Sequence, residues 1–419
     1  MDITFNTPRL SGEIRAISSK SEAHRQLICA ALSDSPTRII CTDTNNDIDA
    51  TVSCLNSLGA NIQRVDDGFS IEPIKAPVDH ANLDCGESGS TLRFIIPIIA
   101  ALGVDASITM HGRLPQRPLS PLYDLLAENG VTMSAQGENP FTVSGKLTSG
   151  DYSIAANVSS QFISGLLFAL SLVEGNSTLT LEGTVESKNY IDMTLDAIRV
   201  FGGNITCDNN KFTIRSKGGF TSPSTTVVGG DWSNAAFFLC ASALSKTAIT
   251  VSGLDTHSSQ GDSAILDVLQ KMGAQIDIRD GKITVLADTL HGIDLDASQI
   301  PDLVPIIATV ASVANGKTVI YNASRLKIKE SDRIASTCAM ISALGGNITP
   351  TDDGMIIVGV ENLFGGVIDS ENDHRIAMSG AIASTVSKNP VTIKGFEAIN
   401  KSYPKFKYDF DKLTLNGEI

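Results

Sequence analysis

The chain has 419 residues, 42% of them hydrophobic, and a formal net charge of −14 at pH 7. This length and hydrophobic fraction predict a globular protein of two or three domains. The negative charge argues against nucleic acid and anionic membrane as partners, so a local cluster of cations would have to bind any anionic ligand.

The cysteines and apolar runs predict a soluble protein of the reducing cytoplasm. Seven cysteines are scattered without a C-x-x-C pair, which favours neither a disulfide framework nor a zinc site. The first 15 residues lack the apolar core of a signal peptide. The longest apolar runs, such as residues 94–102, are too short to cross a bilayer.

A turn that contains glycine recurs along the chain. It ends five helix-like runs, and the first glycines of these turns are Gly59, Gly130, Gly202, Gly273 and Gly345. Their spacing is nearly constant, and one more step of the same length leads to Gly417. Glycine is expected at these places because the residue after a helix often adopts the left-handed conformation.

A second landmark keeps the same period. Markedly apolar helical runs begin at Lys20, Ser90, Ser160, Trp232, Asp302 and Asp373, again at nearly equal intervals. The β-prone stretches after these runs are residues 37–40, 106–109, 178–181, 248–251, 318–321 and 391–393. Two landmarks in phase predict a six-fold internal repeat of about 71 residues, each copy with two helices and several strands.

Units of this size can associate in threes around buried helices. We therefore expect an α/β (α+β) fold of two similar domains. The expected N-terminal lobe is residues 18–228, with repeats 1 to 3, and the expected C-terminal lobe is residues 1–17 plus 229–419, with repeats 4 to 6. A strand over about residues 3–17 precedes the first unit, and the active site is expected in the cleft between the lobes.

Residues 325–333 carry the strongest local signal for an anion site. Charged and apolar side chains alternate, so a strand would place Arg325, Lys327 and Lys329 on one face. Residues 330–332 are typical of a helix start, and the helical run that follows stops at Gly345. A bound anion beside Glu330 would favour its protonated form, which a general acid requires. The alternative is an ordinary edge strand with solvated lysines.

Several other helix starts carry hydroxyl, amide, carboxylate and cationic groups in the same phase of the repeat. The residues concerned are Ser19, Lys20, Ser21 and Arg25; Gly86 to Arg93; Ser159, Ser160 and Gln161; Asp302; and Asn372 to Arg375. Helix N-termini and cations suit phosphate and carboxylate groups, although a single Ser or Asp at such a place is most often only a cap.

Three further segments are candidates for substrate contacts. The Gly-rich stretch before the second apolar helix suits an anion but lacks the ending of a nucleotide P-loop. Arg113 and Arg117 lie in a proline-stiffened loop, Ser187 precedes a helix, and Lys401 is near the C-terminus. The six histidines include no H-x-x-x-H pair, so neither a metal nor a cofactor is expected.

The order of these motifs resembles the 5-enolpyruvylshikimate-3-phosphate synthase family over essentially the whole chain. The blocks 329–333 (Lys-Glu-Ser-Asp-Arg) and 372–375 (Asn-Asp-His-Arg) are together the most specific. The resemblance implies two domains, each of three βαβαββ units around buried helices, an inside-out α/β barrel. It also implies transfer of the enolpyruvyl group of phosphoenolpyruvate to the 5-hydroxyl of shikimate 3-phosphate, with release of phosphate.

The resemblance also implies a set of site residues. Those expected to hold shikimate 3-phosphate are Lys20, Ser21, Arg25, Ser159, Ser160, Gln161, Ser187, Asp302 and Lys329. Those expected to hold phosphoenolpyruvate are Lys20, Gly89, Arg117, Gln161, Arg333, Arg375 and Lys401. Asp302 is expected to be the base and Glu330 the acid, while Lys20 or Lys401 shares in proton transfer.

Two other functions remain open at this point. A UDP-N-acetylglucosamine enolpyruvyl transferase shares the fold and the donor, but that family carries a cysteine in the loop equivalent to residues 111–119, where this chain has none. A non-catalytic phosphometabolite-binding protein would not need both Asp302 and Glu330. The expected partners are small-molecule substrates only, and a monomer is the default.

Overall fold

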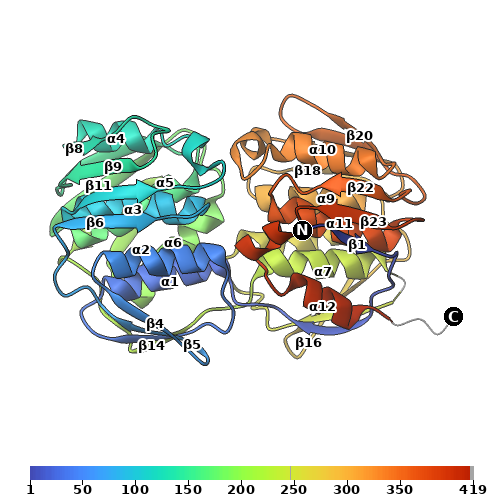
Figure 1. Ribbon diagram of the computed structural model, residues 1–419, viewed down its shortest axis with the longest axis horizontal. Coiled ribbons are helices and arrows are strands. Elements are labelled where there is room, and N and C mark those ends of the chain that lie inside the picture. The colour runs from blue at the N-terminus through green and yellow to red at the C-terminus, as the bar shows by residue number, and fades with distance from the viewer. Residues whose placement is uncertain (246, 416–419) are drawn as a thin grey trace. The chain divides into compact units, whose positions relative to one another are not determined.

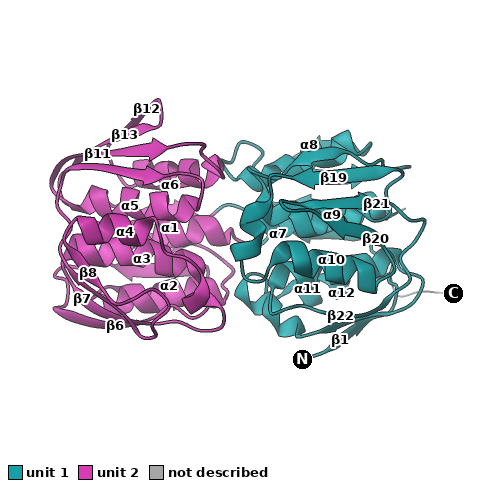
Figure 2. Ribbon diagram, turned by 90° about the horizontal axis from the view of Figure 1, so that it is seen from above, with its two compact units in different colours: residues 1–17, 229–419 teal, residues 18–228 magenta. Residues whose placement is uncertain are grey.

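The computed structural model describes residues 1–245 and 247–415, and the chain forms two compact units (Figure 2). Unit 1 comprises Met1–Ile17 and Gly229–Ile419, and unit 2 comprises Ser18–Val228. Each unit has its own hydrophobic core. Among the described helices, none combines the length and hydrophobicity of a membrane span.

Unit 2 contains three four-stranded sheets. Their strand orders are β14 (Thr225–Val227), β3 (Thr37–Ile40), β5 (Gly68–Glu72), β4 (Asn61–Val65); β6 (His80–Asp84), β7 (Asp105–Thr109), β9 (Phe141–Gly145), β8 (Val131–Met133); and β10 (Asp151–Ala155), β11 (Gly175–Glu182), β13 (Lys211–Ser216), β12 (Ile205–Asp208). Its helices are α1 (Lys20–Ala31), α2 (Asn46–Ser57), α3 (Gly89–Leu102), η1 (Leu114–Gln116), α4 (Leu122–Glu128), α5 (Ser160–Leu172) and α6 (Lys188–Val200).

Unit 1 repeats this plan with one shorter sheet. Its strand orders are β2 (Gly12–Arg15), β15 (Ile249–Ser252), β17 (Lys282–Leu286), β16 (Gln275–Arg279); β18 (Asp294–Asp296), β19 (Lys317–Tyr321), β21 (Met355–Val358), β20 (Asn347–Pro350); and β1 (Ile3–Phe5), β23 (Val391–Lys394), β22 (Gly366–Asp369). Its helices are α7 (Trp232–Leu244), η2 (Gly261–Ala264), α8 (Ile265–Lys271), η3 (Pro301–Leu303), α9 (Val304–Ala311), η4 (Ser324–Ile328), α10 (Arg333–Ala343), α11 (His374–Ala383), η5 (Ser384–Val386), η6 (Phe396–Lys401) and α12 (Phe406–Leu413).

The sheets lie at the outside of each unit, and the apolar helices α3, α5, α7 and α9 lie inside, while helices such as α4 and α12 keep an exposed face (Figures 1 and 2). A helix that is hydrophobic on all sides has to be buried, and α9 buries all eight of its residues. In the strands, buried and exposed residues alternate, as in β11, so one face of the sheet packs on the helices and the other meets water. The mixed α/β fold of repeated units therefore agrees with the prediction.

The two periodic landmarks correspond to real elements. All six predicted β-prone stretches are strands, namely β3, β7, β11, β15, β19 and β23. Gly59, Gly130, Gly202, Gly273 and Gly345 each follow a helix with a positive φ, between 72° and 111°. Gly417 lies outside the described residues.

Two local predictions were wrong. Residues 324–328 form the 3-10 helix η4 and not a strand, because Leu326 packs into the core while the charged side chains on either side point away from it. The predicted strand over about residues 3–17 is divided into β1 and β2. These strands pair with β23 and β15 in two different sheets, so the first residues of the chain complete two repeats of unit 1.

In unit 2, helices α3 and α5 pack against each other, and this packing depends on Gly165 of α5. A Cβ atom there would lie 2.4 Å from the carbonyl oxygen of Arg93 and 2.8 Å from Cγ of Pro97. The Arg93 carbonyl belongs to the backbone of α3, so it cannot move aside without displacing that helix.

We predict that Gly165→Ala lowers the free energy of unfolding by about 1–3 kcal/mol, because overpacking outweighs the better helix propensity of alanine. Urea denaturation followed by circular dichroism measures the change. Gly150→Ala is the control, since its Cβ would meet only the Tyr152 ring edge, at 3.9 Å. Equal stability of the Gly165→Ala protein and the wild type would contradict the packing argument.

Candidate active site

A buried cluster of charged side chains lies at the starts of η3, α10 and α11 in unit 1. Arg333, with a side chain only 1% exposed, is at its centre. Its guanidinium donates to Asp302 at 2.8 Å, to Glu330 at 2.6 Å and to Asp373 at 2.7 Å. Bidentate and charge-assisted bonds of this kind fix the orientation of both partners.

The local sequence explains why these side chains meet. Asp332 caps α10 by accepting from the backbone N–H groups of Ile334 and Ala335, each at 3.1 Å. Asp373 caps α11 by accepting from the N–H of Arg375 at 2.9 Å. The caps define where the two helices begin and so place Arg333 and Arg375 in the first turns.

Asp302 is surrounded by three cations. Besides Arg333, its carboxylate contacts Lys329 Nζ at 3.3 Å and Arg375 Nη2 at 3.5 Å. Burial alone raises the pKa of the Asp302 carboxyl, but Lys329 and the two arginines more than offset it and hold the pKa well below its ordinary value. Asp302 is therefore an anion at neutral pH.

The cations respond to the same balance of burial and charge. Burial lowers the pKa of the Lys329 ammonium below its ordinary value, although Asp302 opposes the shift. Burial also acts to lower the pKa of Arg333, but the carboxylates of Asp373, Glu330 and Asp302 outweigh it and raise the pKa. Charges removed from water stay ionised only with such partners.

Lys401 lies at the end of η6 and has a different kind of partner. Its Nζ donates to the backbone carbonyl of Asn372 at 2.6 Å, one residue before the cap of α11. The lysine is therefore held next to the Asp373–Arg375 turn and is 7% exposed.

In unit 2, the first two turns of α1 provide two cations. Lys20 Nζ donates to Asp47 of α2 at 2.8 Å. Arg25 is buried and donates to the carbonyls of Ser21 and Tyr190 and to Thr194 Oγ1, at 2.6 to 2.8 Å. Burial lowers the pKa of the Arg25 guanidinium to about 10. These bonds connect α1 to α6.

The start of α3 lies against two arginines. A Cβ at Gly89 would be 2.6 Å from Arg117 Nη1 and 2.8 Å from Arg93 Nη1, so a larger residue there would displace these guanidiniums from their present positions. Gln161 of α5 accepts from Arg93 at 2.9 Å and donates to Ser90 Oγ at 2.8 Å. The structure therefore brings together the starts of α3 and α5, with Gly89, Arg117 and Gln161.

Three of the predicted serines lie at helix starts, but in different conformations. Ser159 caps α5 by accepting from the N–H of Gln161 at 3.3 Å, and Ser160 is the first residue of that helix. Ser187 precedes α6 in the left-handed conformation, with φ of 51°, which a non-glycine residue seldom adopts. Backbone strain of this kind is often retained at functional sites.

Comparison with known proteins identifies the relationship. The family described as EPSP synthase (3-phosphoshikimate 1-carboxyvinyltransferase) matches residues 6–410. The chain belongs to the EPSP synthase family. It is 41% identical over 426 residues to a 3-phosphoshikimate 1-carboxyvinyltransferase of Clostridium kluyveri, covering 100% of this chain and 98% of the relative.

Solved structures agree with this membership. An EPSP synthase of Acinetobacter baumannii superposes with a TM-score of 0.81 at 26% identity, covering 99% of this chain and 98% of that one. The enolpyruvyl transferase NikO of Streptomyces tendae gives a TM-score of 0.77 at 18% identity, with coverage of 98% and 96%, which shows similarity of fold alone.

Several partners of the predicted site residues were not predicted from the sequence. Asp47, Ser233 and Asp262 each contact a predicted cation or its neighbour. Asp373 was predicted as part of the block 372–375, but its contact with Arg333 was not. Asp262 gave no signal because it is far from Arg375 along the chain, in a different repeat.

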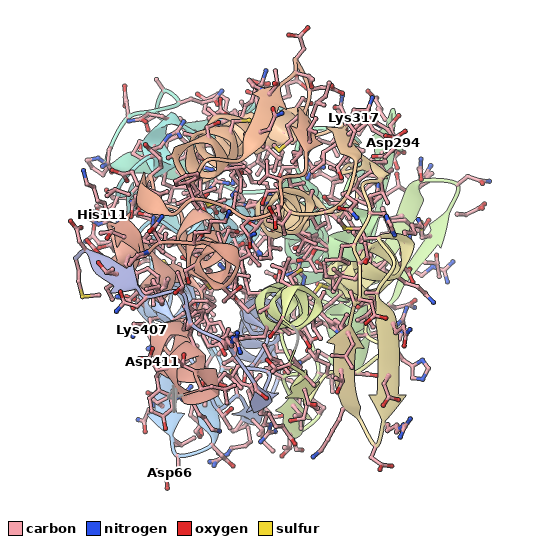
Figure 3. The ribbon with its side chains drawn as sticks, turned by 90° about the vertical axis from the view of Figure 1, so that its right-hand side faces the viewer. Asp66, His111, Asp294, Lys317, Lys407 and Asp411 are labelled. Atoms are coloured by element: carbon pink, nitrogen blue, oxygen red, sulfur yellow. The ribbon has the colours of Figure 1, made fainter. Side chains whose placement is uncertain are left out.

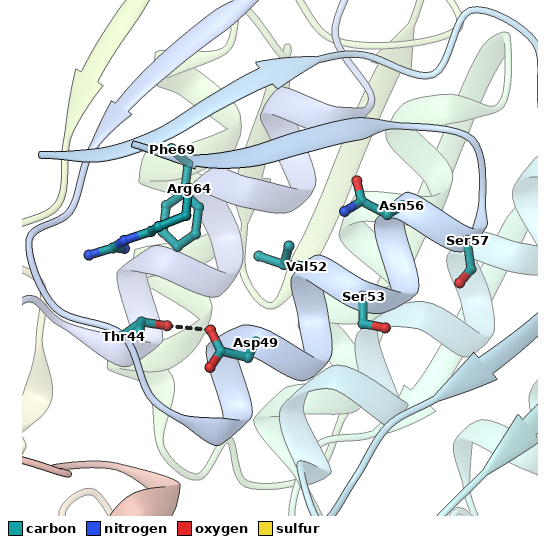
Figure 4. Close-up of a pocket in the computed structure, with 8 residues that line it drawn as sticks. All are labelled: Thr44, Asp49, Val52, Ser53, Asn56, Ser57, Arg64 and Phe69. Atoms are coloured by element: carbon teal, nitrogen blue, oxygen red, sulfur yellow. Dashed lines mark hydrogen bonds between the residues drawn. The ribbon is translucent and has the colours of Figure 1, made fainter. Parts of the chain in front are cut away.

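A cavity of about 600 Å³ lies outside this set of residues (Figure 4). It is between α2 and the strands β4 and β5, and residues such as Asp49, Arg64 and Phe69 line it. Arg64 stacks on Phe69 at 4.7 Å, and Thr44 donates to Asp49. None of the residues predicted from the EPSP synthase motifs lines this cavity. In the described part of the chain, no group of three or more His, Cys, Asp or Glu side chains could hold a metal ion.

The buried cluster differs from the ion pairs at the periphery. Lys407 and Asp411 of α12, labelled in Figure 3, form a pair at 2.7 Å whose side chains are 34% and 56% exposed. Exposed pairs contribute little stability because water competes with both charges. Breaking a buried pair, by contrast, leaves a charge without its compensation.

We predict that Asp373→Ala lowers the free energy of unfolding by about 3–5 kcal/mol, because it removes a partner of buried Arg333 and the cap of α11. Thermal or urea denaturation measures the loss. The control is Asp196→Ala, which breaks an exposed pair with Arg199 and is expected to cost less than about 1 kcal/mol. Similar effects of the two substitutions would show that the buried cluster does not stabilise the unit.

Proposed function

We propose that the chain transfers the enolpyruvyl (1-carboxyvinyl) group of phosphoenolpyruvate to the 5-hydroxyl of shikimate 3-phosphate and releases phosphate. This reaction is a step of the shikimate pathway to chorismate and the aromatic amino acids. The observation that carries the proposal is that two carboxylates, Asp302 and Glu330, contact the same buried Arg333 in a member of the EPSP synthase family. Addition to an alkene requires one group to accept a proton and another to donate one.

We assign the cations to the two anionic substrates. Shikimate 3-phosphate is held by Lys20, Ser21, Arg25, Ser159, Ser160, Gln161, Ser187, Asp302 and Lys329. Phosphoenolpyruvate is held by Lys20, Gly89, Arg117, Gln161, Arg333, Arg375 and Lys401. Two anions side by side repel each other, which is why both sets contain several cations.

Asp302 is assigned as the base. In the free protein its counter-charges hold its pKa low, so it is a weak base. Anionic groups of the substrates would compete for Lys329, Arg333 and Arg375, and the proton affinity of Asp302 rises with every cation that turns from it to a substrate. Substrate binding therefore prepares the carboxylate to accept the 5-hydroxyl proton.

Glu330 is assigned as the acid. Its Oε2 accepts a hydrogen bond from the Arg333 guanidinium at 2.6 Å. An anion of phosphoenolpyruvate bound to Arg333 would weaken that bond and place negative charge beside Glu330. Both changes favour a proton on Glu330, which then passes to the methylene carbon. Lys20 or Lys401 is assigned a share in proton transfer.

The remaining expectations stay part of the proposal. We propose a cytoplasmic monomer that binds only small molecules and no nucleic acid, in keeping with the formal net charge of −14. We expect the reaction to need no cofactor, since the two carboxylates and the lysines provide the proton transfers.

The acceptor can be tested by phosphate release from phosphoenolpyruvate with either shikimate 3-phosphate or UDP-N-acetylglucosamine. We predict release with shikimate 3-phosphate only, because the loop of residues 111–119 has no cysteine, unlike that of the sugar-nucleotide transferases. Release with the sugar nucleotide alone would overturn the assignment, and release with neither acceptor would favour a binding protein without catalysis.

Glu330→Gln tests the acid. The amide keeps the size of the side chain but cannot supply the proton, so we predict that kcat falls about a hundredfold or more while both substrates still bind. Steady-state kinetics and equilibrium binding measure the two effects. Glu361→Gln, the same change at an exposed residue, is the control. Turnover at the wild-type rate would remove Glu330 from the mechanism.

A further inference from the structure

Ser233 links Arg375 to a second buried carboxylate, Asp262. Ser233 is in the first turn of α7, Asp262 is in η2, and Arg375 is in the first turn of α11. Arg375 Nη2 donates to Ser233 Oγ at 2.7 Å, and the Ser233 hydroxyl donates its proton to Asp262 Oδ2. Arg375 Nη1 also lies 3.5 Å from the Ser233 carbonyl oxygen.

The guanidinium of Arg375 thus interacts with two carboxylates through the same nitrogen. Asp302 Oδ2 is 3.5 Å from Nη2, and Asp262 accepts from the Ser233 hydroxyl to which Nη2 donates. Arg375 and Asp262 are each 3% exposed, so water screens neither interaction much. With both carboxylates ionised, neither carboxylate alone determines where the guanidinium lies.

We propose that Asp262 is a positioning residue that, through Ser233, holds Arg375 in the orientation that receives an anionic group of phosphoenolpyruvate. The inference rests on the proposed function, because it takes Arg375 to contact that substrate. Without the Asp262 carboxylate, the guanidinium would close on Asp302. This movement of the guanidinium would turn Arg375 away from the orientation that receives phosphoenolpyruvate. It would also lower the basicity of Asp302 further.

The charge of Asp262 has an energetic cost that supports a functional reason for it. Burial first, and then the neighbouring Asp302, raise the pKa of Asp262 to about 6, while Arg375 and Ser233 oppose the shift. The charged groups that face it are Asp302 from η3, Arg375 from α11 and Asp231 from the cap of α7; helix α8 buries only apolar side chains there.

The direction of the pKa shift of Asp262 distinguishes a positioning role from a stabilising role. A carboxyl with a raised pKa binds its proton more tightly in the folded state, so folding stability falls as the pH rises from about 4 to about 6 and stays lower above that. The ionised Asp262 therefore destabilises the fold at neutral pH. A residue with a purely structural role would do the opposite.

The test is Asp262→Asn in the full chain. We expect KM for phosphoenolpyruvate to rise about tenfold at pH 8, with KM for shikimate 3-phosphate nearly unchanged and kcat lowered less than KM is raised. The thermal midpoint at pH 8 should be equal to or higher than that of the wild type. Asp267→Asn, the same change at an exposed position of α8, should alter none of these values.

The pH profile gives a readout that a structural role would not change. The ratio of KM for phosphoenolpyruvate between Asp262→Asn and the wild type should be largest at pH 8 and approach one near pH 5, where the wild-type Asp262 is mostly protonated and therefore neutral like the asparagine. Ionisation of the substrate cancels in this ratio. A ratio independent of pH, or a lower KM in the variant, would overturn the proposal.

Two further variants complete the design. Ser233→Ala should raise the same KM, and the double variant with Asp262→Asn should be no worse than the worse single variant, since both act through one path. Additive effects would contradict that path. Arg375→Lys separates the two hypotheses: an unchanged KM for phosphoenolpyruvate would refute the proposed role of Arg375. If Arg375→Lys raises KM for phosphoenolpyruvate and Asp262→Asn does not, only the positioning role of Asp262 would be refuted.

Discussion

The charge balance around Arg333 is the constraint on which the rest of unit 1 depends. A guanidinium that is 1% exposed contacts Asp302, Glu330 and Asp373, and Asp302 in turn contacts Lys329 and Arg375. Removing so many charges from water is costly, and only their mutual compensation makes it tolerable. The cluster therefore contains several buried cations whose partners in the free protein are carboxylates.

This balance gives a physical account of how one site could bind anions and then transfer protons. Anionic substrates can replace carboxylates as partners of the cations, so the number of charges in contact is preserved. The carboxylates that lose a cation become better proton acceptors. Substrate binding and the change in the proton affinity of the carboxylates are thus consequences of the same exchange of partners. Asp262, which contacts Arg375 through Ser233, acts on one of the cations that take part in this exchange.

Much of the fold could be predicted because the sequence repeats a simple physical pattern. Three features recur at a nearly constant interval: an apolar helix, a glycine after the second helix of each repeat, and a β-prone stretch. In each repeat the buried side chains are mainly the apolar ones. The failures are instructive. In residues 324–328 the alternation of charged and apolar residues also fits a 3-10 turn that buries Leu326, so period alone could not decide. The division of the N-terminal strand depends on pairing with β23 and β15, which no local pattern reveals.

The candidate site was predictable at the level of motifs and not at the level of partners. Lys20, Glu330, Arg333 and Arg375 belong to specific sequence blocks. Their partners meet them only through tertiary packing: Asp47 contacts Lys20, and Asp262 contacts Arg375 through Ser233. Their residue types are common at helix starts and turns, so sequence alone gave no reason to select them.

The most direct test of the exchange of partners is a crystal structure of the slow Glu330→Gln protein with shikimate 3-phosphate and phosphoenolpyruvate bound. The account predicts that Arg333 and Arg375 contact oxygen atoms of phosphoenolpyruvate and that the Arg375–Asp302 distance exceeds its present 3.5 Å. Substrates bound elsewhere, with every contact of Asp302 to Lys329, Arg333 and Arg375 retained, would contradict it.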